Sequence, residues 1–145
     1  MINPSPDPVM PADAGRVAAD FERAGDSTLI GLISRGSVPA FVELFNRTCE
    51  GARVELAAHF LETAWRREIF AASYVEVWWL AGCHRTPEVD ATAWIAGIVR
   101  RRIEEAVRGM SRHGVRGASE GPRPSYAERE IAALLGRPVD DLLRA

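Results

Sequence analysis

The residue types that most often carry catalysis are present, but they do not converge on one segment. His59, His84 and His113 are scattered, and no HExxH or Gly-x-Ser-x-Gly motif accompanies them. Cys83 directly precedes His84, yet no second pair at metal-ligand spacing completes a zinc site. The glycines form neither a phosphate-binding loop nor a dinucleotide fingerprint. The sequence therefore predicts a protein without catalytic activity, metal or cofactor.

Arginines in residues 91–108, ATAWIAGIVRRRIEEAVR, are the side chains with the clearest chemical potential. At 100° per residue, the apolar residues share one arc: Ala91, Trp94, Ile95, Ile98, Val99, Ile103 and Ala106. Arg100, Arg101 and Arg108 fall on the opposite arc, where guanidinium groups can neutralise phosphate and stack on exposed bases. A solvated face with local ion pairs, such as Arg101 with Glu105, explains the same arginines.

The chain is 145 residues long, the length of one domain, and its formal net charge is −2. All 18 cationic side chains are arginine. Residues 1–65 carry nine acids and five arginines, whereas residues 100–123 carry seven arginines and three acids. This imbalance predicts a surface that faces a polyanion.

Compartment and membrane association follow from apolar run length and cysteine usage. No window approaches eighteen apolar residues, and no basic region followed by an apolar stretch opens the chain, so neither a membrane span nor a secretory signal is expected. Cys49 and Cys83 are isolated, which is typical of a reducing compartment rather than a disulfide framework. These features predict a cytoplasmic protein that does not bind membranes.

Proline and glycine divide the chain into four parts. Prolines at positions 4, 6, 8 and 11 make residues 1–25 a mostly disordered tail. Residues 26–110 carry helical periodicity, residues 111–124 form a flexible linker, and residues 125–145 form a helical hairpin broken at 136–138. No segment alternates like a strand, so the predicted fold is a small all-α bundle.

Four helices are expected within residues 26–110. They are a two-turn helix after the capping residues Asp26-Ser27-Thr28, a long helix from Ser37 to Leu61, a third from Thr63 to Ala81, and the arginine-bearing helix capped by Asp90. The third has an inward stripe of Phe70, Tyr74, Val77, Trp78 and Ala81. Its second apolar strip contains Trp65, Ala72, Val75 and Trp79, interrupted by Glu68 and Glu76. Such a helix is either sandwiched inside the fold or presents one face to a partner.

Several short motifs follow one another across residues 28–108. They are Leu29-Ile30 through Arg35-Gly36, Ala40-Phe41-Val42-Glu43-Leu44-Phe45, Tyr74-Val75-Glu76-Val77-Trp78, and Ala93-Trp94-Ile95-Ala96-Gly97-Ile98-Val99-Arg100, followed by Arg101, Glu105 and Arg108. In this order and spacing they resemble region two of bacterial sigma factors, in the extracytoplasmic-function group of the sigma-70 family. The resemblance implies a helical bundle that docks on the clamp helices of RNA polymerase and melts and reads the promoter's minus-ten element.

Carried over residue by residue, the resemblance implies a role for each surface. Polymerase docking falls to the outer face of the third helix, at Glu68, Ala71, Ala72, Val75 and Trp79. Flipped-out bases of the non-template strand would be held by the loop 82–90, which contains His84 and Arg85, and by the start of the next helix. The residues that would lie along DNA are Arg100, Arg101 and Arg108. The resemblance thus implies a non-enzymatic transcription protein whose partners are the RNA polymerase core and promoter DNA.

Departures from the family pattern keep a second hypothesis open. The docking helix carries Trp65-Arg66-Arg67-Glu68-Ile69-Phe70-Ala71 where the family usually places acidic residues before Asp-x-x-Gln, and Trp79 replaces an expected basic residue. Tryptophan is enriched among interface anchors, so the face around Trp65 and Trp79 also fits a regulatory partner or a second copy of this chain. The chain would then be a protein-interaction module on a sigma scaffold, without DNA binding.

The C-terminal segment resembles an incomplete region four. Residues 126–139 look like the first helix and turn of that helix-turn-helix, but Asp140-Asp141-Leu142-Leu143-Arg144-Ala145 follows in place of a recognition helix. Two aspartates at that position would repel DNA phosphates. We interpret the segment as a region-four remnant, and an ordinary helical hairpin explains the same residues.

Overall fold

The computed structural model describes residues 21–59, 61–83, 90–113, 125–138 and 141, with backbone alone for residues 110–113. Its elements are α2 (Asp26–Ser34), α3 (Val38–Ala57), α4 (Thr63–Leu80), the 3-10 turn η1 (Ala81–Cys83), α5 (Ala91–His113) and α6 (Tyr126–Leu135). No strand occurs among these described residues, and the predicted all-α bundle is confirmed.

Local sequence signals set the helix boundaries. Gly36 has a φ of 88°, a left-handed conformation that glycine adopts without strain, and it turns the chain from α2 into α3. The Ser37 hydroxyl oxygen then caps α3 by accepting a hydrogen bond from the Ala40 N–H at 3.3 Å. Two predicted ends were wrong: α3 stops at Ala57 rather than at Leu61, and α5 runs past residue 110 to His113.

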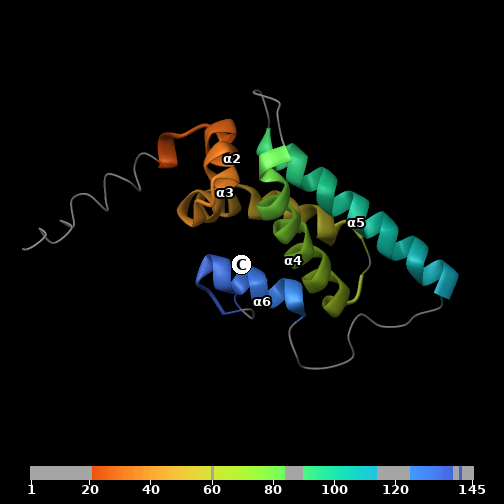
Figure 1. The fold of residues 1–145 in the computed structure, drawn as a ribbon. Coiled ribbons are helices and arrows are strands. Elements are labelled where there is room, and N and C mark those ends of the chain that lie inside the picture. The colour runs from red at the N-terminus through yellow and green to blue at the C-terminus, as the bar shows by residue number, and fades with distance from the viewer. Residues whose placement is uncertain (1–20, 60, 84–89, 114–124, 139–140, 142–145) are drawn as a thin grey trace, which may run out of the picture.

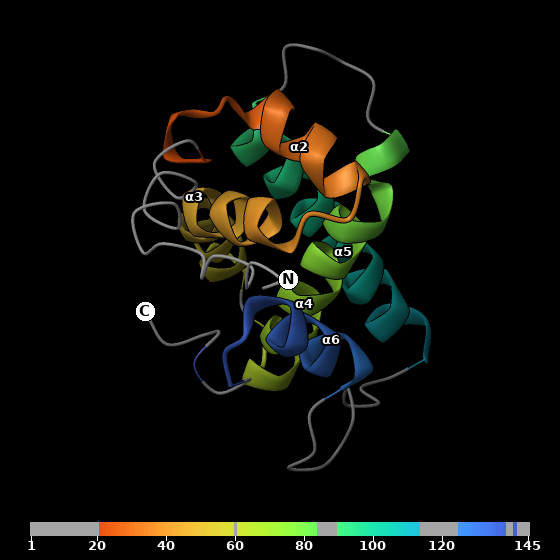
Figure 2. The same cartoon turned by 60° about the vertical axis from the view of Figure 1, so that its left-hand side comes forward.

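Helix α4 lies at the centre of the bundle. It packs against α2, α3, α5 and α6. Figure 1 shows α5 running along one side of α4 and α6 lying on the other, and in Figure 2 α6 crosses in front of the lower half of α4 while α2 lies at its upper end. A helix surrounded in this way keeps only a narrow strip for solvent or for a partner.

Aromatic side chains join α3 and α4 in the core. The ring centroid of fully buried Tyr74 lies 4.7 Å from that of Phe45 and 5.2 Å from that of Phe70. Trp78 meets Phe41 edge-on at 5.4 Å. Such tilted and edge-to-face pairs satisfy the ring quadrupoles and fix how the two helices fit together. The inward stripe predicted for the third helix is therefore confirmed, with Trp78 half-buried and the rest buried.

The inward arc of α5 also matches its prediction. Its buried members are Ala91, Ile95, Ile98, Val99 and Ile103, and Trp94 and Ala106 pack half-buried against the same core. The Asp90 carboxylate caps the first turn, because Oδ1 accepts hydrogen bonds from the N–H groups of Thr92 at 3.0 Å and Ala93 at 3.3 Å. The periodicity and the cap expected for this helix are confirmed.

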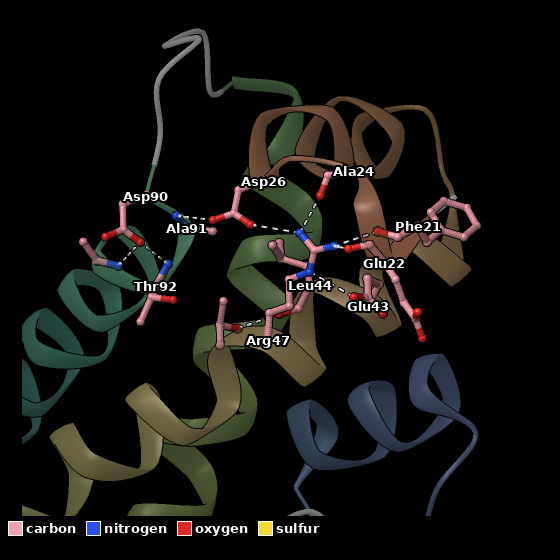
Figure 3. Close-up of polar contacts among 12 residues, drawn as sticks. Phe21, Glu22, Ala24, Asp26, Glu43, Leu44, Arg47, Asp90, Ala91 and Thr92 are labelled. Atoms are coloured by element: carbon pink, nitrogen blue, oxygen red, sulfur yellow. Dashed lines mark hydrogen bonds and ion pairs between the residues drawn. The ribbon is translucent and has the colours of Figure 1, made fainter. Parts of the chain in front are cut away.

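Asp26 does not cap its own helix, whose N-cap is Gly25. Its Oδ2 instead accepts a hydrogen bond from the Ala91 N–H at 3.1 Å, and its Oδ1 lies 3.3 Å from Nη1 of Arg47 (Figure 3). A carboxylate is stabilised at the positive end of a helix, so Asp26 adds a second anion to the start of α5. One side chain of α2 thereby holds both α3 and α5.

Arg47 of α3 ties the segment before α2 to the bundle (Figure 3). Its Nη1 donates to the Ala24 carbonyl at 2.6 Å, and its Nη2 donates to the carbonyls of Phe21 at 2.7 Å and Glu22 at 2.9 Å. Its Nε donates to the Glu43 carboxylate at 2.9 Å. The planar fork of an arginine suits this many acceptors at once.

Helix α6 closes the remaining side of α4. Ser125 and Glu128 form a reciprocal capping box at its start, and Gly136, with a φ of 63°, ends it where the sequence predicts a break. Ile131 is fully buried, and the Glu128 carboxylate lies 3.3 Å from Nε of Arg67 on α4. The first half of the predicted C-terminal hairpin is thus a helix packed on α3 and α4, while its second half lies almost wholly outside the described residues.

Candidate functional site

Arg100 and Arg101 leave α5 in directions about 100° apart, because successive residues of an α-helix differ by that angle. Arg100 reaches α3, where its Nη2 donates to Glu55 Oε1 at 2.6 Å. Arg101 reaches α4, where its Nη2 donates to both carboxylate oxygens of Glu76 at 2.5 Å. The arginines that the sequence places on the outward arc of this helix therefore reach to both flanks of α5.

Both guanidinium groups remain open to solvent although they are paired. The Arg100 and Arg101 side chains are 56% and 52% exposed, whereas those of Glu55 and Glu76 are 24% and 15% exposed. The hydrogen bond to Glu55 raises the pKa of Arg100 above its already high ordinary value, so this group stays charged at physiological pH. The arginines lie at the surface, and their acidic partners lie deeper.

Counter-charges neutralise the arginine face. Arg102 Nη2 lies 3.4 Å from Glu76, Arg108 Nη2 lies 3.7 Å from Glu104, and Arg101 Nε lies 3.9 Å from Glu105. The last two are pairs that the four-residue spacing predicts. The described face thus sets four arginines, Arg100, Arg101, Arg102 and Arg108, against four glutamates, Glu55, Glu76, Glu104 and Glu105. The formal charge of this face is balanced. The excess of arginine over acidic residues in 100–123 does not indicate this balance, because Glu55 and Glu76 lie outside that segment.

Arg108 differs from the other two predicted DNA-contacting arginines. Its side chain is 68% exposed, and its acidic partner, Glu104, lies on the same helix rather than on a neighbouring one. It borders a hollow of about 290 Å³ that is also lined by His59, Ile103 and Val107. Of the three arginines, it is the most accessible to a ligand approaching from solvent.

The outer face of α4 is narrower than the sequence predicts. Trp79 is 65% exposed, but Glu68, Ala72 and Val75 are half-buried, and Val75 packs against the core cluster. Ala71, included in the docking face by the resemblance, is 1% exposed and belongs to the core. Crowding by neighbouring helices is the cause, since α2, α3, α5 and α6 all pack against α4.

Trp65 is not part of an open face. It packs half-buried against the core cluster, and its indole Nε1 is buried with no hydrogen-bond partner among the described residues. Trp65 therefore belongs partly to the core, and partner binding through the face around Trp65 and Trp79 stays a prediction. The exposed apolar side chains at the far end of α4 are Trp79 and, at 40% exposure, Leu80.

The ion pair between Arg101 and Glu76 connects the two candidate binding surfaces, which are the outer strip of α4 and the outer side of α5. Glu76 lies next to Val75 on α4, and its carboxylate holds the arginine of α5. The strip of α4 around Trp79 and the flank of α5 around Arg101 are consequently neighbours. His84 and Arg85, predicted to contact flipped-out bases, lie outside the described residues.

Sequence reasoning missed the acidic partners Glu55 and Glu76. The position of Glu76 could have indicated its role. It interrupts the second apolar strip of its helix, where a carboxylate needs a cationic partner and another helix could supply one. No sequence feature indicates the role of Glu55, because that role depends on how closely α3 and α5 approach. Among the described residues no three His, Cys, Asp or Glu side chains form a group that could hold a metal ion.

Comparison with protein-family models, curated proteins and solved structures gave no significant match to this chain. None of the helices in the described part of the chain is both long enough and apolar enough to cross a bilayer. The function is therefore argued from the residues and their arrangement.

Proposed function

We propose that this chain is a non-enzymatic, sigma-factor-like transcription protein. In this proposal the strip of α4 around Trp79 docks on the clamp helices of RNA polymerase, and the outer side of α5 lies along single-stranded promoter DNA of the minus-ten element. The observation that carries the proposal is the contact between Arg101 and Glu76, which places the two surfaces side by side. A protein bound to α4 and a nucleic-acid strand bound to α5 would then be neighbours in one complex.

Physical chemistry supports the protein-docking half of this proposal. Trp79 is a large apolar side chain of α4 that is 65% exposed, and its neighbour Leu80 is 40% exposed. Tryptophan supplies much of the binding free energy in protein interfaces, because it buries a large area at little cost in conformational entropy. Half-buried Val75 and Ala72 lie on the same strip and would add their exposed parts to an apolar contact.

Docking is tested by binding the full chain to purified core RNA polymerase. We expect Trp79→Asp to weaken binding at least tenfold, since it places a charge in a desolvated contact. Val54→Asp is the matched control, because Val54 is 61% exposed on α3, away from the α4 strip, and should leave the affinity unchanged. Equal loss in both variants, or none in Trp79→Asp, would contradict docking through α4.

A second candidate function is supported by the charge balance of α5. If the four glutamates neutralise the arginines permanently, the chain is a protein-interaction module that binds a regulatory protein or itself through the Trp79 strip. Sedimentation of the wild-type protein with and without single-stranded DNA separates the two candidates. Association that depends on Trp79 but is indifferent to DNA favours the module.

A further inference from the structure

The glutamates that accept hydrogen bonds from Arg100 and Arg101 come from other helices, and this is the feature from which the inference starts. Glu55 belongs to α3 and Glu76 to α4, whereas both arginines belong to α5. Each carboxylate occupies N–H positions on a guanidinium that a phosphate oxygen would use. The folded chain thus supplies its own anions at the sites where the proposed function requires those of DNA.

We infer that Glu55 and Glu76 are built-in competitors of nucleic-acid phosphate, which hold the arginines of α5 against α3 and α4 until a strand displaces them. This inference rests on the proposed contact between α5 and single-stranded DNA. It adds a regulatory property to that contact: the acidic residues set how much phosphate is needed before the arginines become available.

The two members of each ion pair differ in solvent exposure, as a contact that a ligand can displace requires. The glutamates are mostly covered, at 24% and 15% exposure, so they remain with their own helices. The arginines are more than half exposed and have long, flexible side chains that can swing outward without moving the backbone. Ion pairs between partly exposed side chains are weak, so several phosphates acting together can outcompete them.

The two glutamates should not contribute equally. Glu55 holds only Arg100 among the described residues, whereas Glu76 holds Arg101 at 2.5 Å and also lies 3.4 Å from Arg102. Removing the charge of Glu76 therefore takes an acidic partner from two cations, of which Arg101 keeps a more distant pair with Glu105 at 3.9 Å. Removing the charge of Glu55 takes an acidic partner from one.

The test uses the full chain with a fluorescein-labelled single-stranded DNA of about 16 nucleotides. We expect Glu55→Gln to tighten binding about twofold to fivefold at roughly 50 mM salt, and Glu76→Gln to tighten it more. Each released guanidinium that gains a phosphate should also steepen the slope of log affinity against log salt by about 0.7. A change of slope reports additional phosphate contacts, which a merely structural effect would not produce.

Glu50→Gln is the matched control. Glu50 is also on α3, its side chain is 80% exposed, and the arginine with which it pairs, at 4.0 Å, is Arg53 of the same helix. The substitution removes the same formal charge but takes no partner from Arg100 or Arg101. It should therefore change neither the affinity nor the salt slope appreciably. Thermal unfolding monitored by circular dichroism verifies that all variants are folded.

The outcomes separate the inference from the proposed function. Tightening with a steeper slope in Glu55→Gln and Glu76→Gln, but not in Glu50→Gln, supports the inference. Wild-type binding that neither substitution tightens, or that all three substitutions tighten equally without a change in slope, overturns the inference and leaves the proposed DNA contact standing. Absence of binding by every protein, including the Glu55→Gln/Glu76→Gln double variant, overturns both.

Discussion

The carboxylate of Asp26 accepts a hydrogen bond from the backbone N–H of Ala91 at 3.1 Å, joining the first residue of α2 to the first residue of α5. The other oxygen of the same carboxylate lies 3.3 Å from Nη1 of Arg47 on α3. A single acidic side chain therefore fixes where α5 starts relative to two other helices. The orientation of the arginines further along α5 depends on this start.

Asp26→Ala should lower the free energy of unfolding by about 1–3 kcal/mol. It leaves the Ala91 N–H without its acceptor and removes one acceptor from Arg47. Thr28→Ala, on an exposed residue of the same helix, should change stability by less than about 0.5 kcal/mol. Urea denaturation measures both. Equal effects of the two substitutions would show that the Asp26 contacts do not stabilise the fold.

Arg47→Lys should release the segment before α2 while preserving the positive charge. An ammonium group cannot reproduce the fork that reaches the carbonyls of Phe21, Glu22 and Ala24 together. We expect the Ala24 amide, which donates to the Phe21 carbonyl at 3.2 Å, to exchange at least tenfold faster with deuterium. Exchange that stays at the wild-type rate would refute this role.

The control for that experiment is Arg35→Lys. Arg35 is exposed, and it lies just after α2. The same chemical substitution there should leave exchange at Ala24 unchanged, so any acceleration specific to Arg47→Lys reports the loss of its hydrogen bonds.

The close approach of α3 and α5 can be measured at Gly51. A Cβ at this position would lie 2.8 Å from Cγ2 of Thr92, so an alanine there requires Thr92 to move. Alanine also favours a helix interior over glycine by about 1 kcal/mol. We therefore expect Gly51→Ala to be more stabilising in a Thr92→Ala background than in the wild type, by roughly 1 kcal/mol of coupling.

Gly31→Ala provides the reference for this double-mutant cycle. A Cβ at Gly31 of α2 would meet nothing within 4 Å, so the gain from helix propensity should be the same in both backgrounds. A coupling near zero between Gly51 and Thr92 would mean that the two helices are not in contact there in solution.

Tyr74 should make the fold sensitive to alkaline pH. Burial raises the pKa of its phenol well above the ordinary value of about 10, and the hydrogen bond with Thr48 offsets only part of this rise. Its contribution to stability is complete below the unfolded pKa. As the pH rises above that value the unfolded chain loses the proton and the folded chain keeps it, so the free energy of unfolding falls by up to about 1.4 kcal/mol per pH unit.

Urea denaturation between pH values of about 9 and 11 tests this dependence. Tyr74→Phe should flatten the alkaline fall. Tyr126→Phe, at a 71% exposed position, should retain most of it, although the pKa of Tyr126 is itself raised by its hydrogen bond to Glu130. A steep fall that persists in Tyr74→Phe would assign the effect to another group.

Local and periodic features of this fold were predictable from the sequence. The buried arc of α5, the inward stripe of α4 and the cap at Asp90 all depend on residues within a few positions of one another. Apolar spacing at three and four residues sets which face of a helix is buried, and it does so before the partner helix is known.

Features that depend on how helices pack were not predictable. The spacing of Arg100 and Glu104 predicts a pair within α5, but the guanidinium of Arg100 instead pairs with Glu55 of α3, at 2.6 Å. The sequence of α4 has apolar residues on two faces, and it does not determine how much of the second face other helices cover. Packing against the four neighbouring helices decides this, leaving Trp79 exposed and Trp65 half-buried.

The central claim is that this chain binds RNA polymerase, and gel filtration of the full chain with purified core enzyme at about 10 μM of each tests it most directly. The account predicts that the chain elutes with the polymerase and that Trp79→Asp elutes apart from it. A wild-type chain that elutes only at its own volume, with no trace in the polymerase fractions, would contradict the claim.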